Sequence, residues 1–303
     1  MGDTTRQIIE EIAELKKKRN AVILAHNYQR MEVQKIGDFV GDSLDLSRKA
    51  SRTDADIIVF CGVYFMAESA KILSPKKTVL LPEESAGCIL ADSADPWQLK
   101  KLKKAHPGAA VVSYINCYAE IKALSDICCT SANALKVVES LPHEEIIMLP
   151  DKNLASWIQK QTKKKIIKWD GVCCVHDRIK PEEVIGVKNE HPNAVIIAHP
   201  ECREAVVAIA DYVTGTTGML NLAAELKEKE MIIITEIGLV ERLRELHPEK
   251  IFHTVKGGMV CKDMKVTTLE SVRNSLLNLE HPVEVEEEIR VKAFAALDRM
   301  LNL

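Results

Sequence analysis

The sequence predicts an α/β fold of three similar αβα domains, whose short parallel sheets are arranged around a pseudo-threefold axis with the active site at the centre. Two observations lead to this prediction. Three copies of one pattern of apolar runs and helical segments follow each other at intervals of roughly 86 residues, as in an internal repeat. In each copy the apolar runs are short and uninterrupted, as expected of strands that are covered on both faces of a parallel sheet.

The first strand of each copy is expected at residues 21–25, 109–113 and 194–198. These runs end at or beside His26, Tyr114 and His199, which recur at the interval of the repeat. Second strands are expected at residues 57–60, 146–149 and 232–234, and third strands at residues 78–81, 165–168 and 251–255. Solenoid repeats have periods of roughly 20 to 50 residues. The longer period found here indicates that each copy is a small domain.

Helical segments are expected between these strands. The segments at residues 95–105 and 181–190 have a proline in or next to their first turn, where proline is favoured. Each is followed by a His-Pro pair, which prevents the helix from continuing. Four histidines that precede proline are therefore interpreted as turn residues: His106, His191, His247 and His281. An amphipathic helix is expected over residues 1–19.

The repeat also predicts where the domains begin and end. The first domain is expected to hold residues 1–87 together with C-terminal helices in residues 262–303. The second is expected to hold residues 88–172, and the third residues 173–261. Parallel sheets bind ligands beyond the carboxyl ends of their strands. Three domains that face inward would therefore form one polar site.

Composition argues against several classes of protein. Among 303 residues, 41 are basic and 44 acidic, which gives a net charge of −3 and no electrostatic footprint for nucleic acid. A hydrophobic content of 47% is ample for buried cores, yet no 18-residue apolar stretch indicates a membrane span. The N-terminal segment is amphipathic and does not resemble a signal peptide. We expect a cytoplasmic protein with no nucleic-acid or membrane partner.

The nine cysteines are expected to be reduced in a cytoplasmic chain. Cys88, Cys173 and Cys261 differ from the rest, because each follows the third strand of its copy and the three recur at the interval of the repeat. Three thiolates leave one position of a metal site open, whereas a closed zinc site or an electron-transfer cluster needs four protein ligands. Five others are interpreted as packed side chains: Cys61, Cys117, Cys128, Cys129 and Cys202.

The residues alone leave other metal sites open. His176 closely follows Cys173 in a Cys-x-x-His string and could complete a Cys3His zinc site. Loop ligands of zinc usually come in close pairs, which does not favour this alternative. Cys174 could replace its neighbour Cys173 as a ligand, but Cys173 holds the position that matches the repeat.

Polar residues gather at the predicted strand ends: His26, Tyr28, Tyr114, Asn116, His199 and Glu201. Hydroxyl residues recur at equivalent positions of the three copies, at Ser43, Ser131 and Thr216, with Thr217 next to the third. Each lies near a predicted helix start, where backbone N–H groups and the helix dipole favour anions. Helix capping alone is the alternative for any single Ser or Thr. Recurrence in three copies favours an anion site.

Several strings of residues together resemble one family over essentially the whole chain. They are Ile23-Leu24-Ala25-His26-Asn27-Tyr28, Gly41-Asp42-Ser43, Cys129-Thr130-Ser131-Ala132-Asn133, Gly171-x-Cys173-x-x-His176, His199-Pro200-Glu201-Cys202 and Thr235-Glu236-Ile237-Gly238. The sequence is similar in these strings, and in the three cysteines, to quinolinate synthase. Any one string would be weak evidence, but six in order are specific.

The resemblance implies an iron–sulfur enzyme of the pathway to NAD. It would condense iminoaspartate with dihydroxyacetone phosphate to quinolinate, releasing phosphate and water. Cys88, Cys173 and Cys261 would hold a [4Fe–4S] cluster with one open iron that acts as a Lewis acid. The enzyme that supplies iminoaspartate would be a partner. The fold implied is three αβα domains around a central site, as the repeat indicates independently.

The remaining site residues receive roles that suit anionic substrates. Tyr28 and Glu201 are the acid–base candidates, because each lies two positions past a strand-end histidine and should share its face. His26 and His199 are expected to donate hydrogen bonds to substrate, and Tyr114 and Asn116 to orient it. Two alternatives stay open: another [4Fe–4S] hydro-lyase of the aconitase type, and a non-catalytic iron–sulfur or zinc sensor.

Overall fold

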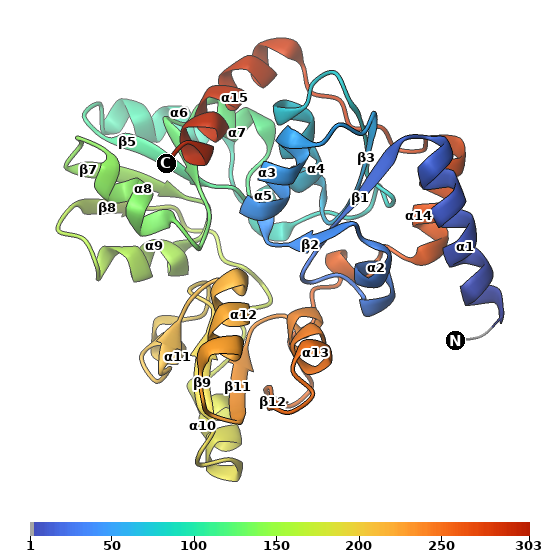
Figure 1. Cartoon of the computed structure of the whole chain (residues 1–303). Coiled ribbons are helices and arrows are strands. Elements are labelled where there is room, and N and C mark those ends of the chain that lie inside the picture. The colour runs from blue at the N-terminus through green and yellow to red at the C-terminus, as the bar shows by residue number, and fades with distance from the viewer. Residues whose placement is uncertain (1–2) are drawn as a thin grey trace.

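The computed structural model describes residues 3–303 and contains three four-stranded sheets, all of whose strand pairs are parallel. The strand orders are β2-β1-β3-β4, β6-β5-β7-β8 and β10-β9-β11-β12, so the three sheets share one topology. Figure 1 shows them as three lobes that meet at the centre of the molecule. The α/β class and the three similar αβα units predicted from the sequence are confirmed.

The elements follow one another in the same order in each unit, apart from the additional short helix α5 at the start of the second unit. The first unit contains α1 (Asp3–Lys18), β1 (Ala21–His26), α2 (Met31–Ile36), β2 (Phe39–Gly41), α3 (Ser43–Arg52), β3 (Ile57–Cys61), α4 (Tyr64–Leu73) and β4 (Thr78–Leu80). The second contains α5 (Ile89–Asp92), α6 (Pro96–Ala105), β5 (Ala110–Tyr114), α7 (Ala119–Ala123), β6 (Ile127–Cys129), α8 (Ala134–Ser140), β7 (Glu145–Leu149), α9 (Lys152–Gln159) and β8 (Lys165–Lys168). The third contains α10 (Pro181–Glu190), β9 (Val195–Ala198), α11 (Glu204–Val207), β10 (Tyr212–Val213), α12 (Thr216–Glu225), β11 (Glu230–Ile234), α13 (Ile237–Leu246) and β12 (Ile251–His253).

The central strands are buried on both faces because alternate side chains enter two different cores. In β1, Val22 and Leu24 pack with α3 and α4, whereas Ile23 and Ala25 pack with α1 and α14 (Leu269–Asn278). The third sheet repeats this division between one core that includes α10 and another that includes α12 and α13. Strands that are buried on both faces need apolar residues at every position, which is why continuous apolar runs predicted these strands.

One hydrogen-bond pattern recurs in all three units and supports the repeat. An aspartate just before the edge strand accepts a hydrogen bond from a backbone N–H of the first strand, at 2.8, 2.7 and 2.8 Å. These residues are Asp38, Asp126 and Asp211, which occupy equivalent positions of the repeat. The same side-chain contact thus fixes the loop that precedes the edge strand in each unit.

The prediction of three strands per unit was incomplete. The edge strands β2, β6 and β10 are only 3, 3 and 2 residues long, too short to stand out as apolar runs. The predicted helix ends are confirmed at three of the His-Pro pairs, because His106, His191 and His247 are the C-cap residues of α6, α10 and α13. No helix among residues 3–303 is long and apolar enough to cross a membrane.

The two C-terminal helices pack in different places. Helix α14 lies against α1 of the first unit, whereas α15 (Glu287–Leu301) lies against α7 and β6 of the second unit and also against α4 (Figure 1). Helix α15 therefore connects the first two lobes. The division of the chain at residues 87, 172 and 261 stays a prediction.

Candidate active site

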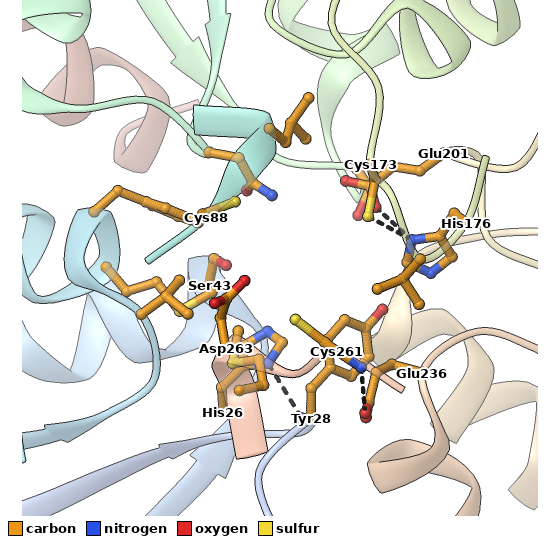
Figure 2. A pocket seen from close by; sticks show the side chains of 18 of the residues that line it. His26, Tyr28, Ser43, Cys88, Cys173, His176, Glu201, Glu236, Cys261 and Asp263 are labelled. Atoms are coloured by element: carbon orange, nitrogen blue, oxygen red, sulfur yellow. Dashed lines mark hydrogen bonds and ion pairs between the residues drawn. The ribbon is translucent and has the colours of Figure 1, made fainter. Parts of the chain in front are cut away.

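A pocket of about 800 Å³, including the open solvent at its mouth, lies where the three units meet. Its wall contains nearly all the side chains predicted for the site, from all three units: His26, Tyr28, Ser43, Cys88, Tyr114, Asn116, Ser131, Cys173, His199, Glu201, Thr216 and Cys261. Figure 2 shows the three cysteines entering from separate segments around the cavity. Residues from distant parts of the sequence therefore share one site, because each unit presents the carboxyl ends of its strands to it.

Each of the three cysteines is placed by the same backbone contact. Helices α4, α9 and α13 follow the equivalent strands β3, β7 and β11. The backbone N–H of the first residue of each helix donates to the backbone carbonyl of the residue two positions before the cysteine, at 2.8 Å in every unit. The pairs are Tyr64 with Ala86, Lys152 with Gly171, and Ile237 with Met259. An unpaired N–H at a helix start thus finds an acceptor in the cysteine loop. Equivalent loops on three equivalent helices bring the three thiols to one pocket.

His26 and His199 occupy equivalent positions and are held in the same way. The backbone N–H of Tyr28 donates to Nδ1 of His26 at 3.2 Å, and that of Glu201 donates to Nδ1 of His199 at 3.3 Å. Burial lowers the pKa of His26 to about 4 and that of His199 to about 3. Both rings are therefore neutral at pH 7, and each carries its proton on Nε2, where it can be donated to a ligand.

A chain of polar groups connects the two acid–base candidates. The Tyr28 hydroxyl lies 2.7 Å from the Thr235 hydroxyl, which lies 2.9 Å from Nε2 of His176. Nδ1 of His176 lies 2.8 Å from Oε2 of Glu201. Tyr28 and Glu201 are thus linked through two buried side chains and can exchange protons through them.

The other oxygen of Glu201 makes no hydrogen bond of normal length among the described residues, although the Tyr114 side chain lies near the carboxylate and lowers its pKa. Glu201 is only 3% exposed, and its Oε1 atom makes no hydrogen bond. Burial opposes ionisation, but the hydrogen bond that Nδ1 of His176 donates to Oε2 outweighs it and keeps the pKa of Glu201 below its usual value. Unpaired buried acceptors are rare in native proteins. Glu201 is therefore an ionised carboxylate with one oxygen available to a ligand, and Oδ1 of Asn116 is also buried without a partner.

The repeated hydroxyls meet near two helix starts. Ser43 and Thr216 are the first residues of α3 and α12, and Ser131 Oγ lies so close to Gly215 that a Cβ atom there would approach it to 2.6 Å. None of the three acts as the N-cap of its helix, since those positions belong to Asp42, Asn133 and Gly215. The capping alternative is therefore wrong for these residues.

Thr217 is placed differently from the other predicted site residues. Its hydroxyl donates to Asp42 at 2.7 Å and to Asp45 at 3.2 Å, and its side chain is not part of the pocket wall. The hydroxyl thus joins α12 to the start of α3. The Asp42 carboxylate also accepts from the N–H groups of Leu44 and Asp45, which caps α3.

Several residues of the pocket wall were not assigned to the site from the sequence. Those with polar side chains include Asp42, Thr130, His176, Glu236 and Asp263. Asp42 and Glu236 lie inside the strings shared with the family. The sequence therefore gave their places in the chain, but it did not show that their side chains face the pocket. The strand argument for Tyr28 and Glu201 was also inexact: both lie beyond the ends of β1 and β9, and turns bring them to the site.

A second group of metal-ligand residues lies outside the pocket. Ligand atoms of His191, Glu230 and His253 all lie within 4.8 Å of one another. The two imidazole rings are stacked, with centroids 3.5 Å apart and planes 18° from parallel. Their nitrogen lone pairs lie in nearly parallel planes and do not converge on one ion. The group is better described as a stacked histidine pair beside a carboxylate.

The fold and the pocket define an α/β enzyme that acts on small molecules, with neutral histidines, an ionised carboxylate and three free thiols around one cavity. The family profile described as quinolinate synthetase A protein matches residues 10–302. Quinolinate synthase of Thermodesulfovibrio yellowstonii is 53% identical over 296 residues, with 97% of this chain and 98% of the relative covered. Quinolinate synthase 1 of Methanosarcina acetivorans is 54% identical, with 97% of each chain covered. The chain belongs to the quinolinate synthase family.

The low pKa of His26 predicts how the stability of the metal-free protein depends on pH. The folded state disfavours the protonated ring, so the unfolded chain binds more protons below pH 6.5 and stability falls as the pH decreases toward about 4. A shift of this size corresponds to about 3 kcal/mol of free energy. Urea unfolding across this range should therefore show a smaller loss of stability in His26→Asn than in the wild type.

The matched control for this test is His143→Asn, which changes an exposed histidine. It should lose stability as the wild type does. An unchanged pH dependence in His26→Asn would show that His26 does not have to be neutral in the folded protein.

Proposed function

We propose that the protein condenses iminoaspartate with dihydroxyacetone phosphate to quinolinate, releasing phosphate and water, in the pathway to NAD. The observation that carries the proposal is the meeting of three free cysteines, one from each unit, with Tyr28 and Glu201 in one pocket. Membership of the quinolinate synthase family along nearly the whole chain supports the same reaction.

Cys88, Cys173 and Cys261 would hold a [4Fe–4S] cluster. The donor set fits this group, because thiolates are the ligands of such clusters and three of them leave one iron for substrate. Burial raises the pKa of the Cys88 and Cys261 thiols to about 12 and also raises that of Cys173. Bound metal would offset this by favouring the thiolate forms. When bound, the open iron would supply Lewis-acid chemistry.

His26, His199 and the repeated hydroxyls would bind the anionic groups of the substrates. The neutral histidines can donate from Nε2, and Ser43, Ser131 and Thr216 place hydroxyls at the pocket wall. The N-cap residue of α12 is Gly215, which has no side chain to cap the helix, so the first N–H groups of α12 are available to a phosphate. Tyr114 and Asn116 would orient the substrate, the latter through its unpaired oxygen.

Tyr28 and Glu201 would transfer the protons that the condensation and the loss of water require. Glu201 is ionised and can accept a proton at Oε1, while burial raises the pKa of Tyr28 well above its usual value and keeps its hydroxyl protonated. At pH 7 Glu201 is thus in the form that can accept a proton, and Tyr28 is in the form that can donate one. The chain through Thr235 and His176 would return the proton from Glu201 to Tyr28 between steps.

The alternatives from the sequence find less support. The ligand atoms of His176, Cys173 and Glu201 lie within 4.8 Å of one another, but those of Cys88 and Cys261 do not belong to this group, so the structure gives no support to a Cys3His zinc site. A sensor would not need an ionised carboxylate with an unpaired oxygen beside its metal. A hydro-lyase of the aconitase type is disfavoured by the similarity of the whole chain to quinolinate synthases. The protein that supplies iminoaspartate is proposed as a partner enzyme.

The acid–base roles predict the behaviour of two near-isosteric variants. Anaerobic wild-type protein should form quinolinate from iminoaspartate and dihydroxyacetone phosphate. Tyr28→Phe and Glu201→Gln keep the shapes of the side chains but remove proton transfer, so kcat should fall by about 10²–10⁴-fold while the cluster spectrum is unchanged. A kcat within about twofold of wild type in both variants would leave these side chains as positioning groups only.

The anion site predicts competition by inorganic phosphate with dihydroxyacetone phosphate. Ser43→Ala and Ser131→Ala should each weaken inhibition by phosphate by about tenfold or more, since each removes a hydrogen bond to a charged group. Ser140→Ala is a matched control, because its hydroxyl bonds to the Val137 carbonyl on α8 and is not part of the pocket wall. Inhibition that is unaltered in both pocket variants would place the phosphate site elsewhere.

A further inference from the structure

Two of the three cysteines are held by a contact that the third lacks. Asp151 Oδ2 accepts a hydrogen bond from the backbone N–H of Cys173 at 3.1 Å, and Glu236 Oε1 accepts one from Cys261 at 3.2 Å. Figure 2 shows the second of these contacts. The two acids occupy equivalent positions as the N-cap residues of α9 and α13, and the N-cap residue of α4 in the first unit is Val63. A valine side chain has no acceptor, so the backbone N–H of Cys88 has no carboxylate partner equivalent to Asp151 or Glu236.

Each carboxylate uses its second oxygen to cap the helix that follows the central strand. Asp151 Oδ1 accepts from the N–H of Leu154 at 2.7 Å in α9, and Glu236 Oε2 accepts from that of Gly238 at 2.6 Å in α13. One side chain thus joins a helix start to the backbone of a cysteine. The cysteine loop and the helix therefore move together.

The burial of Asp151 and Glu236 indicates that these acids do more than cap their helices. Asp151 is 1% exposed and Glu236 is 0% exposed, whereas Asp95, which caps α6 by the same kind of bond, is partly exposed. A buried carboxylate is costly unless its oxygens are hydrogen-bonded. Glu236 is additionally paired with Lys265 at 3.0 Å. In both acids the cysteine N–H is one of the donors that offset this cost, so the acid and the cysteine stabilise each other's position.

We propose that Asp151 and Glu236 are positioning residues that hold Cys173 and Cys261 ready to bind the cluster. The inference rests on the proposed function, because it concerns the ligands of that cluster. Outer groups that orient metal ligands commonly change metal affinity by about ten- to a hundredfold when they are removed. The fixed backbone at Cys173 and Cys261 should slow cluster loss.

The test compares iron release from anaerobically isolated protein in Asp151→Asn and Glu236→Gln. An asparagine can still cap α9, but its amide group would set an N–H donor against the N–H of Cys173. Release to the chelator bathophenanthroline, followed by absorbance, should be about tenfold or more faster than in wild type. Asp95→Asn is the matched control, since it makes the same substitution at a helix cap with no bond to a cysteine, and it should release iron at the wild-type rate.

The outcomes separate this inference from the proposed function. Wild-type protein without iron and sulfide would contradict the cluster itself. A wild-type protein that holds the cluster, with both variants releasing iron at the rate of Asp95→Asn, would overturn the positioning role alone. The melting temperature of each metal-free variant shows whether it is folded, and Glu236→Gln decides the question if Asp151→Asn does not fold.

Discussion

The structure depends on one backbone hydrogen bond that occurs three times. The first N–H of the helix after the central strand donates to the carbonyl two positions before a cysteine, at 2.8 Å in each unit. A helix start has unpaired N–H groups that need acceptors, and a loop running back over the sheet supplies one. Because three units repeat this geometry and face one another, the thiols of Cys88, Cys173 and Cys261 reach a single pocket.

Burial gives that pocket its chemical character. Removal from water keeps His26 and His199 neutral and keeps Tyr28 protonated. Glu201 remains ionised because His176 donates a hydrogen bond to its carboxylate. An ionised carboxylate, a protonated phenol and two neutral imidazoles are thus held in the same pocket as the three thiols. Such a site can bind anionic substrates through directed donors and move protons within a hydrogen-bonded chain.

Features with a strong pattern in the sequence could be predicted, and features set by tertiary contacts could not. The central strands were visible because burial on both faces requires continuous apolar residues, as in β3 and β7. The edge strand β10 was missed because two residues carry no pattern. Cys88, Cys173 and Cys261 were predicted to meet because their spacing follows the repeat. The hydrogen bond from the Cys173 N–H to Asp151 could not be predicted, because the sequence does not distinguish a buried aspartate from an exposed aspartate that caps a helix. Thr217 was expected in the pocket because it adjoins Thr216, but a helix turns successive side chains to different directions.

If the three units place their cysteines around one cluster, the iron and sulfide content of anaerobically isolated protein measures it most directly. Wild-type protein should contain about four of each per chain. The cluster should be lost in Cys88→Ala, Cys173→Ala and Cys261→Ala, and retained in Cys61→Ala, which changes a buried thiol of β3 that is not part of the pocket wall. An intact cluster in any of the first three variants would contradict this arrangement of the cysteines.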